Sequence, residues 1–278
     1  MLEIKSIKKA YNRNGEKITP IENIDLKIDR GEFICLLGPS GCGKSTLLNI
    51  ISGLDNPDSG NIYMNGKKIK GPGKDRIVMF QDSGLFPWLT VKENIEFGLR
   101  INNFSDTEIE NRVNKYLRMV HLFRFKDSYI HEISGGMRQR AALARALALD
   151  SEVLLMDEPF SALDSQTKTL LQQELQKIWW ETGKTVIFVT HNVEEAVLLG
   201  TRIILMGTNP GRIKREIKVD ISIPRKPADR NVRYIQEKII EELKEEVEKV
   251  ASKEFDEEWT IEKDTILHSP DNDLGANI

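Results

Sequence analysis

Residues 38–45 read Gly-Pro-Ser-Gly-Cys-Gly-Lys-Ser, a spacing of glycines followed by Lys and Ser that suits a phosphate chain. The glycines let backbone N–H groups converge on an anion, and a helix that begins after them aims its positive end at the same point. In such a loop Lys44 binds the β- and γ-phosphates, and the Ser45 hydroxyl coordinates Mg²⁺. The alternative, a glycine-rich turn without a ligand, is disfavoured by the strand-like run before the loop and the helix-like run after it. The sequence therefore predicts a nucleoside triphosphate site formed by Gly38, Pro39, Ser40, Gly41, Cys42, Gly43, Lys44, Ser45 and Thr46.

A second chemical feature is a pair of carboxylates, Asp157 and Glu158, directly after the apolar run 153–156. Parallel α/β sheets place ligands at the carboxyl ends of their strands, so this pair is expected at the same edge as the phosphate loop. There Asp157 is predicted to hold the Mg²⁺ shell, and Glu158 to polarise the water that attacks the γ-phosphate. A solvated pair of loop carboxylates is the alternative, and the phosphate loop favours the catalytic interpretation.

A third feature is Ser134-Gly135-Gly136, which precedes the strong helix-forming run 141–147. Two glycines at the start of a helix form a small nest of N–H groups that favours an anion. The alternative is a helix cap with no ligand.

Short apolar runs that alternate with helical patterns must position these groups. They predict a mostly parallel sheet covered on both faces, behind an antiparallel N-terminal layer. A hairpin turn is expected at Asn65-Gly66, and the region from about 90 to 150 is expected to be helical. The expected strands cover residues 2–7, 24–28, 33–37, 61–64, 67–69, 76–80, 153–156, 185–189 and 202–206.

The composition narrows the class of protein. The length of 278 residues fits one large α/β domain with an appendage or two small domains, and 40% hydrophobic with 30% charged residues is typical of soluble globular chains. No apolar stretch is long enough to span a bilayer, the first residues lack a signal-peptide layout, and two cysteines indicate a reducing compartment. The net charge of −3 divides into −8 for residues 231–278 and +5 for the rest, which does not indicate a nucleic-acid surface.

Together the three features resemble the motifs of the ABC (ATP-binding cassette) ATPases over residues 1 to about 220. Ser134-Gly135-Gly136 matches the family's signature, although Ile133 and Met137 stand where Leu and Gln are usual. The resemblance implies an α/β P-loop NTPase fold with a helical subdomain at about 90–150. It implies an ATPase domain over residues 1–225, followed by an acidic C-terminal helix and tail over 226–278.

The resemblance also implies roles for residues that spacing alone would not single out. Gln81 matches the glutamine that contacts Mg²⁺, His191 the histidine that touches the γ-phosphate, and Tyr11 the aromatic residue that stacks on adenine. Residues 161–164 match the loop that crosses to a second subunit. In the family, two copies join head to tail, so that the phosphate loop of one copy faces the signature of the other across ATP.

Three segments resemble the nitrate/sulfonate/taurine importer branch of the family. They are Leu85-Phe86-Pro87-Trp88, residues 157–164 and residues 209–213. In that branch the ATPase is a separate peripheral chain on the cytoplasmic face of the membrane, and a permease subunit is expected to dock near residues 81–88. A solute-binding protein is an indirect partner, and the solute itself is not specified by this chain. Phe86 and Trp88 either line the groove that receives a permease helix or pack the helical subdomain onto the sheet.

Several alternatives stay open at this stage. A non-transport ABC protein acting on ribosomes or DNA usually carries two cassettes or a long coiled coil, and a P-loop kinase or GTPase leaves the signature without a role. An apolar stripe marks an acidic helix after Pro227, and it either packs on the chain's own core or docks on a partner. The stripe consists of Val232, Ile235, Ile239, Leu243, Val247 and Val250.

Overall fold

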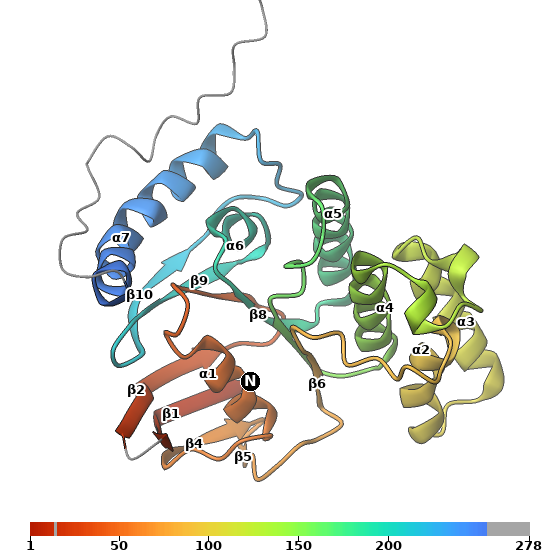
Figure 1. Cartoon of the computed structure of the whole chain (residues 1–278), viewed down its shortest axis with the longest axis horizontal. Helices are drawn as coiled ribbons and strands as arrows, with labels where there is room; N and C mark the ends of the chain where they lie inside the picture. Colours follow the sequence, from red (N-terminus) through yellow and green to blue (C-terminus); the bar gives the residue numbers. More distant parts are fainter. Residues whose placement is uncertain (14–15, 255–278) are drawn as a thin grey trace, which may run out of the picture.

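The computed structural model describes residues 1–13 and 16–254, which form two β-sheets with helices between and around them (Figure 1). The larger sheet has six strands in the order β10-β9-β3-β8-β7-β6. All neighbours in it are parallel except the edge strand β10, which is antiparallel to β9. This confirms the predicted mostly parallel sheet. Its strands are β3 (Phe33–Leu37), β6 (Arg76–Met79), β7 (Val153–Asp157), β8 (Thr185–Thr190), β9 (Arg202–Gly207) and β10 (Arg212–Lys218).

The smaller sheet is antiparallel, with the order β2-β1-β4-β5, and confirms the predicted N-terminal layer. Ile4 of β1 pairs with Leu26 of β2 on one side and with Ile62 of β4 on the other. The turn between β4 and β5 has positive φ at Asn65 (49°) and Gly66 (76°), as a type I′ hairpin requires. Its strands are β1 (Leu2–Arg13), β2 (Glu16–Ile28), β4 (Ser59–Met64) and β5 (Lys67–Lys68).

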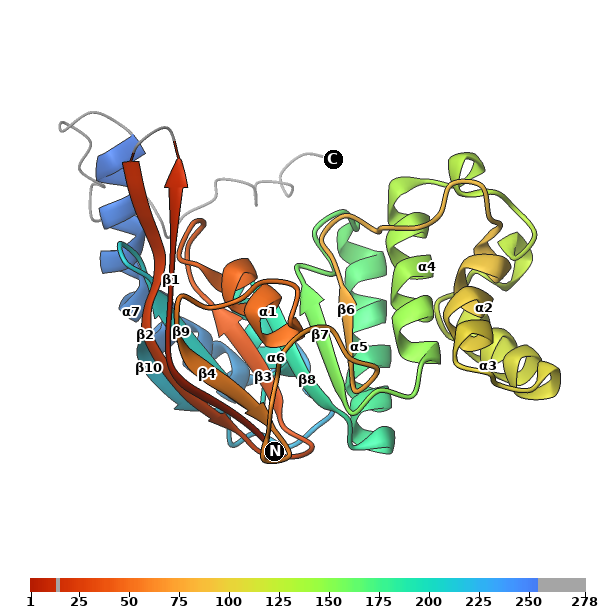
Figure 2. The same cartoon turned by 90° about the horizontal axis from the view of Figure 1, so that it is seen from below.

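The six-stranded sheet is covered on both faces. Successive side chains of a strand point to opposite sides, so each strand contributes residues to two cores. Ile34 and Leu36 of β3 belong to the core shared with the smaller sheet and α1 (Lys44–Ser52). Phe33 and Cys35 belong to the other core, on the face covered by helices. Figure 2 shows α1 lying between the two sheets. The second core includes residues of α5 (Ser165–Thr182), α6 (Val193–Leu199) and α7 (Arg230–Glu254), together with residues of a further group of helices.

A group of helices extends from the β6 and β7 side of the sheet (Figure 2). Two of them begin with capping boxes, in which Thr90 pairs with Glu93 and Ser105 with Glu108, so the sequence itself fixes where they start. The group contains α2 (Val91–Ile101), α3 (Asp106–Met119), the 3₁₀-helices η1 (Phe123–Phe125) and η2 (Ile130–Glu132), and α4 (Gly135–Ala148).

The acidic helix α7 packs on the chain's own core through part of its apolar stripe. Val232, Ile239 and Leu243 are buried, whereas Val247 is 44% exposed. Near the end of the helix, the buried Glu246 accepts hydrogen bonds from the Thr208 N–H (2.9 Å) and the Thr208 hydroxyl (3.3 Å) after β9. The Val250 side chain and the predicted acidic tail after residue 254 lie outside the described residues.

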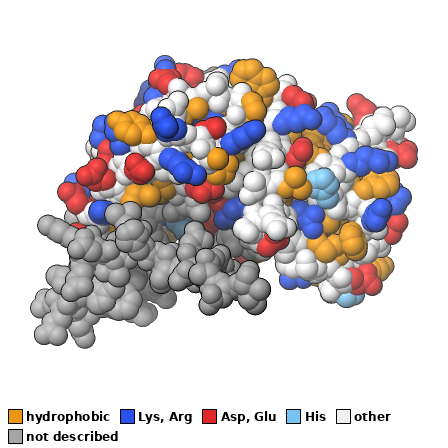
Figure 3. All heavy atoms as spheres, turned by 90° about the horizontal axis from the view of Figure 1, so that it is seen from above, with side chains coloured by type: hydrophobic (Ala, Val, Ile, Leu, Met, Phe, Trp, Pro, Cys, Tyr) orange, Lys and Arg blue, Asp and Glu red, His pale blue; other side chains and the backbone are white. Residues whose placement is uncertain are grey.

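Charges of both signs share the molecular surface. On the face shown in Figure 3, Lys and Arg side chains are interspersed with acidic, apolar and uncharged ones. Within the part of the chain that the structure describes, no helix is long and apolar enough to cross a membrane.

Candidate nucleotide-binding site

The phosphate loop occupies residues 38–43, between the fully buried strand β3 and the start of α1. Gly43 caps α1 in the left-handed region, with φ of 91°, and a Cβ there would lie 2.4 Å from the Pro20 carbonyl oxygen. A Cβ on Gly38 would lie 2.6 Å from the Met206 carbonyl oxygen. Both positions therefore require glycine, and the backbone N–H groups of the loop stay accessible to an anion.

Lys44 is buried (6% exposed), and its ammonium turns back into the loop. It donates to the carbonyl oxygens of Gly38 (2.7 Å) and Pro39 (2.8 Å). Its Nζ also lies 3.6 Å from Cys42 Sγ, yet burial dominates over this cation and raises the pKa of the Cys42 thiol. Cys42 is thus a small filler of the loop and not an activated thiol.

Asp157, at the end of β7, lies beside the start of α1. The Ser45 hydroxyl donates to its Oδ1 at 3.2 Å, and the carboxylate is largely buried. Burial raises the pKa of Asp157, and the charge of Glu158 adds to this, whereas the Ser45 hydrogen bond and the Lys44 charge oppose it. The Asp157 carboxylate forms no ion pair within the described residues. This carboxylate and the Ser45 hydroxyl are hard oxygen donors, which suit Mg²⁺ when phosphates and water supply its other ligands.

Glu158 and His191 meet because β7 and β8 are neighbours in register, with Asp157 opposite Val189. His191 Nδ1 lies 3.1 Å from Glu158 Oε1, and the Glu158 N–H donates to the Val189 carbonyl oxygen at 3.0 Å. Glu158 has φ of 45°, in the left-handed region that non-glycine residues rarely adopt. The predicted groups Lys44, Ser45, Asp157, Glu158 and His191 are thus brought to one edge of the sheet, at the ends of β3, β7 and β8.

Tyr11 and Gln81 lie at the margins of this edge. Tyr11, on β1, donates its hydroxyl to Asp55 Oδ2 at 2.6 Å. Burial and the Asp55 carboxylate raise the pKa of Tyr11 to about 12, and the Thr46 hydroxyl opposes the shift. Gln81 follows β6, is exposed, and forms no hydrogen bond among the described residues.

Ser134-Gly135-Gly136 is not brought to the phosphate loop of its own chain. Ser134 caps α4 by accepting the Met137 N–H at 3.2 Å, and Gly135 is exposed. In Figure 2, strands β6 and β7 lie between α1 and α4. Within residues 1–13 and 16–254, no hydrogen bond joins this nest to the phosphate loop.

A family model described as ABC transporter matches residues 21–161, about half of the chain, and this stretch contains the phosphate loop, the signature and the carboxylate pair. This chain belongs to the ABC transporter family. The predicted family membership is thereby confirmed, and the protein is an ABC ATPase.

Named relatives agree with the predicted branch. The chain is 44% identical to the nitrate import ATP-binding protein NrtD of Synechocystis sp. over 220 residues, which cover 79% of this chain and 83% of the relative. It is 41% identical to the aliphatic sulfonates import ATP-binding protein SsuB of Bacillus thuringiensis over 242 residues (87% and 95%). It is 45% identical to the taurine import ATP-binding protein TauB of Ruegeria pomeroyi over 219 residues (78% and 82%).

A solved ABC ATPase structure agrees with the fold. The dimeric structure of a post-hydrolysis state of the ATP-binding cassette MJ0796, bound to ADP and Pi, has a TM-score of 0.73 and 37% identity. The match covers 80% of this chain and 100% of the solved one.

The ABC ATPase carries an apolar hollow of about 330 Å³ between the sheet and the helical group. Phe86 packs on Phe97 of α2 and on Trp88, with ring centroids 4.6 Å and 5.4 Å apart. Phe86 therefore packs against the helical group, as one interpretation predicts, whereas Trp88 is 69% exposed and its place in a docking groove stays a prediction. Arg145 of α4 donates to the Gly84 (2.8 Å) and Ser83 (3.0 Å) carbonyl oxygens beside the hollow.

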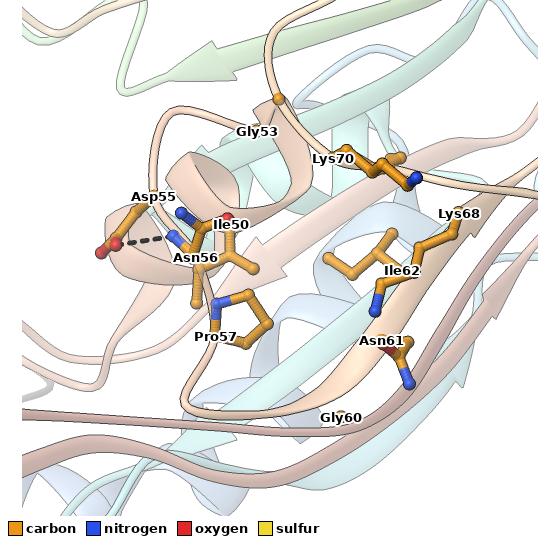
Figure 4. A pocket seen from close by; sticks show the side chains of 12 residues that line it. Ile50, Gly53, Asp55, Asn56, Pro57, Gly60, Asn61, Ile62, Lys68 and Lys70 are labelled. Atoms are coloured by element: carbon orange, nitrogen blue, oxygen red, sulfur yellow. Dashed lines mark hydrogen bonds between the residues drawn. The ribbon is translucent and has the colours of Figure 1, made fainter.

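A second hollow, of about 370 Å³, lies between the end of α1 and the β4–β5 hairpin (Figure 4). Lys68 and Lys70 line it, and both side chains extend from its rim. Figure 4 also shows that the Asp55 carboxylate is turned away from these lysines and accepts the Asn56 N–H at 2.7 Å. The buried Lys9 donates to the same oxygen, Oδ1, at 2.6 Å, and Tyr11 donates to Oδ2, so both oxygens of Asp55 already have partners outside the hollow.

The sequence analysis missed Glu195, a buried residue that supports His191. Its carboxylate accepts the Thr190 hydroxyl at 2.6 Å and pairs with Lys168 of α5 at 2.8 Å. Asn192 caps α6 by accepting the Glu195 N–H at 3.1 Å. The Asn192 cap was the local signal that could have indicated an ordered loop after β8.

Proposed function

We propose that this chain is the ATP-hydrolysing subunit of an importer for a small solute of the nitrate, sulfonate or taurine kind, and that it works as a head-to-tail dimer. The observation that carries the proposal is a site split in two. Lys44, Ser45, Asp157, Glu158 and His191 converge on the phosphate loop, while the signature nest faces away at the start of α4. A second copy, arranged as in the dimeric relative, is the natural source of the missing half.

Binding of ATP begins with the loop. The N–H groups of residues 38–46 and the positive end of α1 attract the triphosphate, and the Lys44 ammonium exchanges the carbonyls of Gly38 and Pro39 for phosphate oxygens. Tyr11 stacks on adenine, oriented by its hydrogen bond to Asp55. Ser134, Gly135 and Gly136 of the second copy bind the γ-phosphate from the other side.

The Ser45 hydroxyl, the Asp157 carboxylate and the Gln81 amide oxygen would hold Mg²⁺, which would supply positive charge to the triphosphate. The position of Asp157 supports this assignment, because its buried carboxylate lies beside the Ser45 hydroxyl and forms no ion pair among the described residues.

Hydrolysis then needs an oriented water. Glu158 accepts a proton from the water while the water oxygen forms a bond to the γ-phosphorus. The bond from that phosphorus to the β–γ bridging oxygen breaks, which leaves ADP and inorganic phosphate. His191 holds Glu158 through Nδ1, which leaves its other ring nitrogen for the γ-phosphate.

The dimer is coupled to transport through a separate permease at the cytoplasmic face of the membrane. The hollow is lined by Phe86, and the exposed Trp88 packs on that ring, so this surface suits a short helix with a few apolar anchors. A solute-binding protein is an indirect partner that delivers the solute to the permease. The face shown in Figure 3 carries mixed rather than uniformly basic charges, so this face gives no support to the alternative of a non-transport ABC ATPase acting on nucleic acid.

The test is the specific ATPase rate of the purified chain as a function of its concentration, at saturating ATP and Mg²⁺. Because two copies complete each site, the rate per chain is expected to rise with concentration and then level off. Glu158→Gln, prepared identically, measures contaminating activity. A wild-type rate per chain that is constant down to concentrations where the protein is monomeric would refute the shared site.

A further inference from the structure

We propose that Gln139 is a positioning residue for Glu158, and that it holds this base from the signature helix α4; the inference rests on the proposed function. Gln139 is 4% exposed and lies one turn after the signature nest. Its Nε2 donates to the Glu158 carbonyl oxygen at 3.4 Å, and its Oε1 accepts the Ala162 N–H at 3.0 Å. One side chain thus binds both the base and the loop 161–164 that follows it.

The Glu158 backbone needs such support because its φ of 45° is unfavourable for a residue with a Cβ. Such a conformation persists only where several contacts fix it. The Glu158 N–H donates to Val189, and its carbonyl oxygen accepts both the Ser161 N–H (3.2 Å) and Gln139 Nε2. Val189 belongs to the neighbouring strand β8, whereas Gln139 reaches Glu158 from a helix and ties the strained residue to α4.

The helix and the loop are also in close contact. A Cβ on Gly136 would lie 3.3 Å from Leu163 Cδ2, so α4 rests directly on the loop at the turn before Gln139. Positions three apart lie on one face of a helix, which places Gly136 and Gln139 on the same side of α4. The helix that offers Ser134 to the partner's nucleotide is therefore the helix that holds this chain's own Glu158.

The two contacts make opposite demands on the side chain. Ala162 requires an acceptor and Glu158 requires a donor, and only an amide satisfies both. Gln139→Glu keeps the acceptor but turns an oxygen toward the Glu158 carbonyl, whereas Gln139→Met has similar length and removes both contacts.

The experiment compares kcat with nucleotide affinity for the full chain. Each variant is titrated with a non-hydrolysable ATP analogue and Mg²⁺, and kcat is expressed per analogue-binding site, so that misfolded protein does not count. The matched control is Gln172→Met on α5, because Gln172 is equally buried (3% exposed) and bonds neither Glu158 nor Ala162 within the described residues.

We expect Gln139→Met and Gln139→Glu to lower kcat by about tenfold or more, as a displaced base does, with analogue affinity within about twofold of wild type. Gln172→Met should keep the wild-type kcat. If both Gln139 variants retain the control's kcat while wild type hydrolyses ATP, the inference is wrong and the proposed function stands. If wild type itself shows no Glu158-dependent hydrolysis, the proposed function fails instead.

Discussion

Arg225 offers a quantitative test of how the C-terminal segment is fastened to the core. The side chain is 3% exposed and has no carboxylate partner among the described residues. Its guanidinium donates to four carbonyl oxygens: Val197 (2.8 Å) and Gly200 (2.6 Å) at the end of α6, Val219 (3.1 Å) and Ile221 (3.0 Å). Burial lowers the pKa of Arg225, and the carbonyls at the helix C-terminus are the groups that compensate a buried cation.

The perturbation is Arg225→Met, which keeps the stem and removes the guanidinium. Four largely buried carbonyls then lose their donor, at about 1–3 kcal/mol each, while the cost of burying a charge disappears. The net loss is expected to be about 3–5 kcal/mol, or roughly 10 °C in the melting temperature of a domain this large.

The assay is thermal unfolding by circular dichroism without nucleotide. Arg30→Met is the matched control, because the Arg30–Glu152 pair (2.7 Å) lies at the surface with Arg30 65% exposed, and surface pairs contribute about 1 kcal/mol or less. Arg225→Lys should fall between the two, since one ammonium cannot reach all four oxygens. A melting temperature of Arg225→Met equal to that of Arg30→Met would refute the reasoning.

Three further predictions concern the nucleotide site and the hollow beside Phe86. Burial and Glu158 raise the pKa of Asp157, so the folded state without nucleotide binds this proton more readily than the unfolded chain does. The contribution of Asp157 to stability therefore increases as pH falls from neutral through the raised pKa. Asp157→Asn should melt at a higher temperature than wild type at neutral pH, but Mg²⁺ and ATP should not raise its melting temperature further. A melting temperature below that of wild type would count against this. Tyr11→Phe, which loses the hydrogen bond to Asp55, should weaken ATP binding in calorimetry by roughly three- to tenfold but leave tripolyphosphate binding unchanged; equal losses for both ligands would remove Tyr11 from the adenine site. Trp88→Ser should keep the ATPase rate of the isolated chain but abolish its sedimentation with native membranes that contain the permease, and undiminished sedimentation would argue against the groove.

The chemistry-bearing residues could be found from sequence because they follow local patterns. A buried strand, a glycine loop and a helix start lie next to one another in the chain, and parallel strands bring Asp157 and His191 to the same edge. Strand lengths were harder to predict: β1 runs on from Leu2 to Arg13, beyond the expected residues 2–7, because Lys8 and the buried Lys9 interrupt the apolar alternation of the sequence.

The residues that support the site could not be found from sequence. Arg225 and Gln176 bond across 49 positions, Tyr11 and Asp55 across 44, and Gln139 and Glu158 across 19. Arg225, Gln176 and Gln139 are buried polar side chains that no apolar period or motif marks, and only the packed fold brings these partners, or Asp55 to Tyr11, within reach.

The central claim, that two copies of the chain enclose ATP between them, is tested most directly by the mass of Glu158→Gln in light scattering coupled to size exclusion. With saturating ATP and Mg²⁺ this variant cannot consume the nucleotide, and the account predicts a dimer that reverts to monomer when the nucleotide is removed. Ser134→Arg in the same background obstructs the nest and should stay monomeric. A Glu158→Gln chain that remains monomeric with ATP and Mg²⁺ bound would contradict the account.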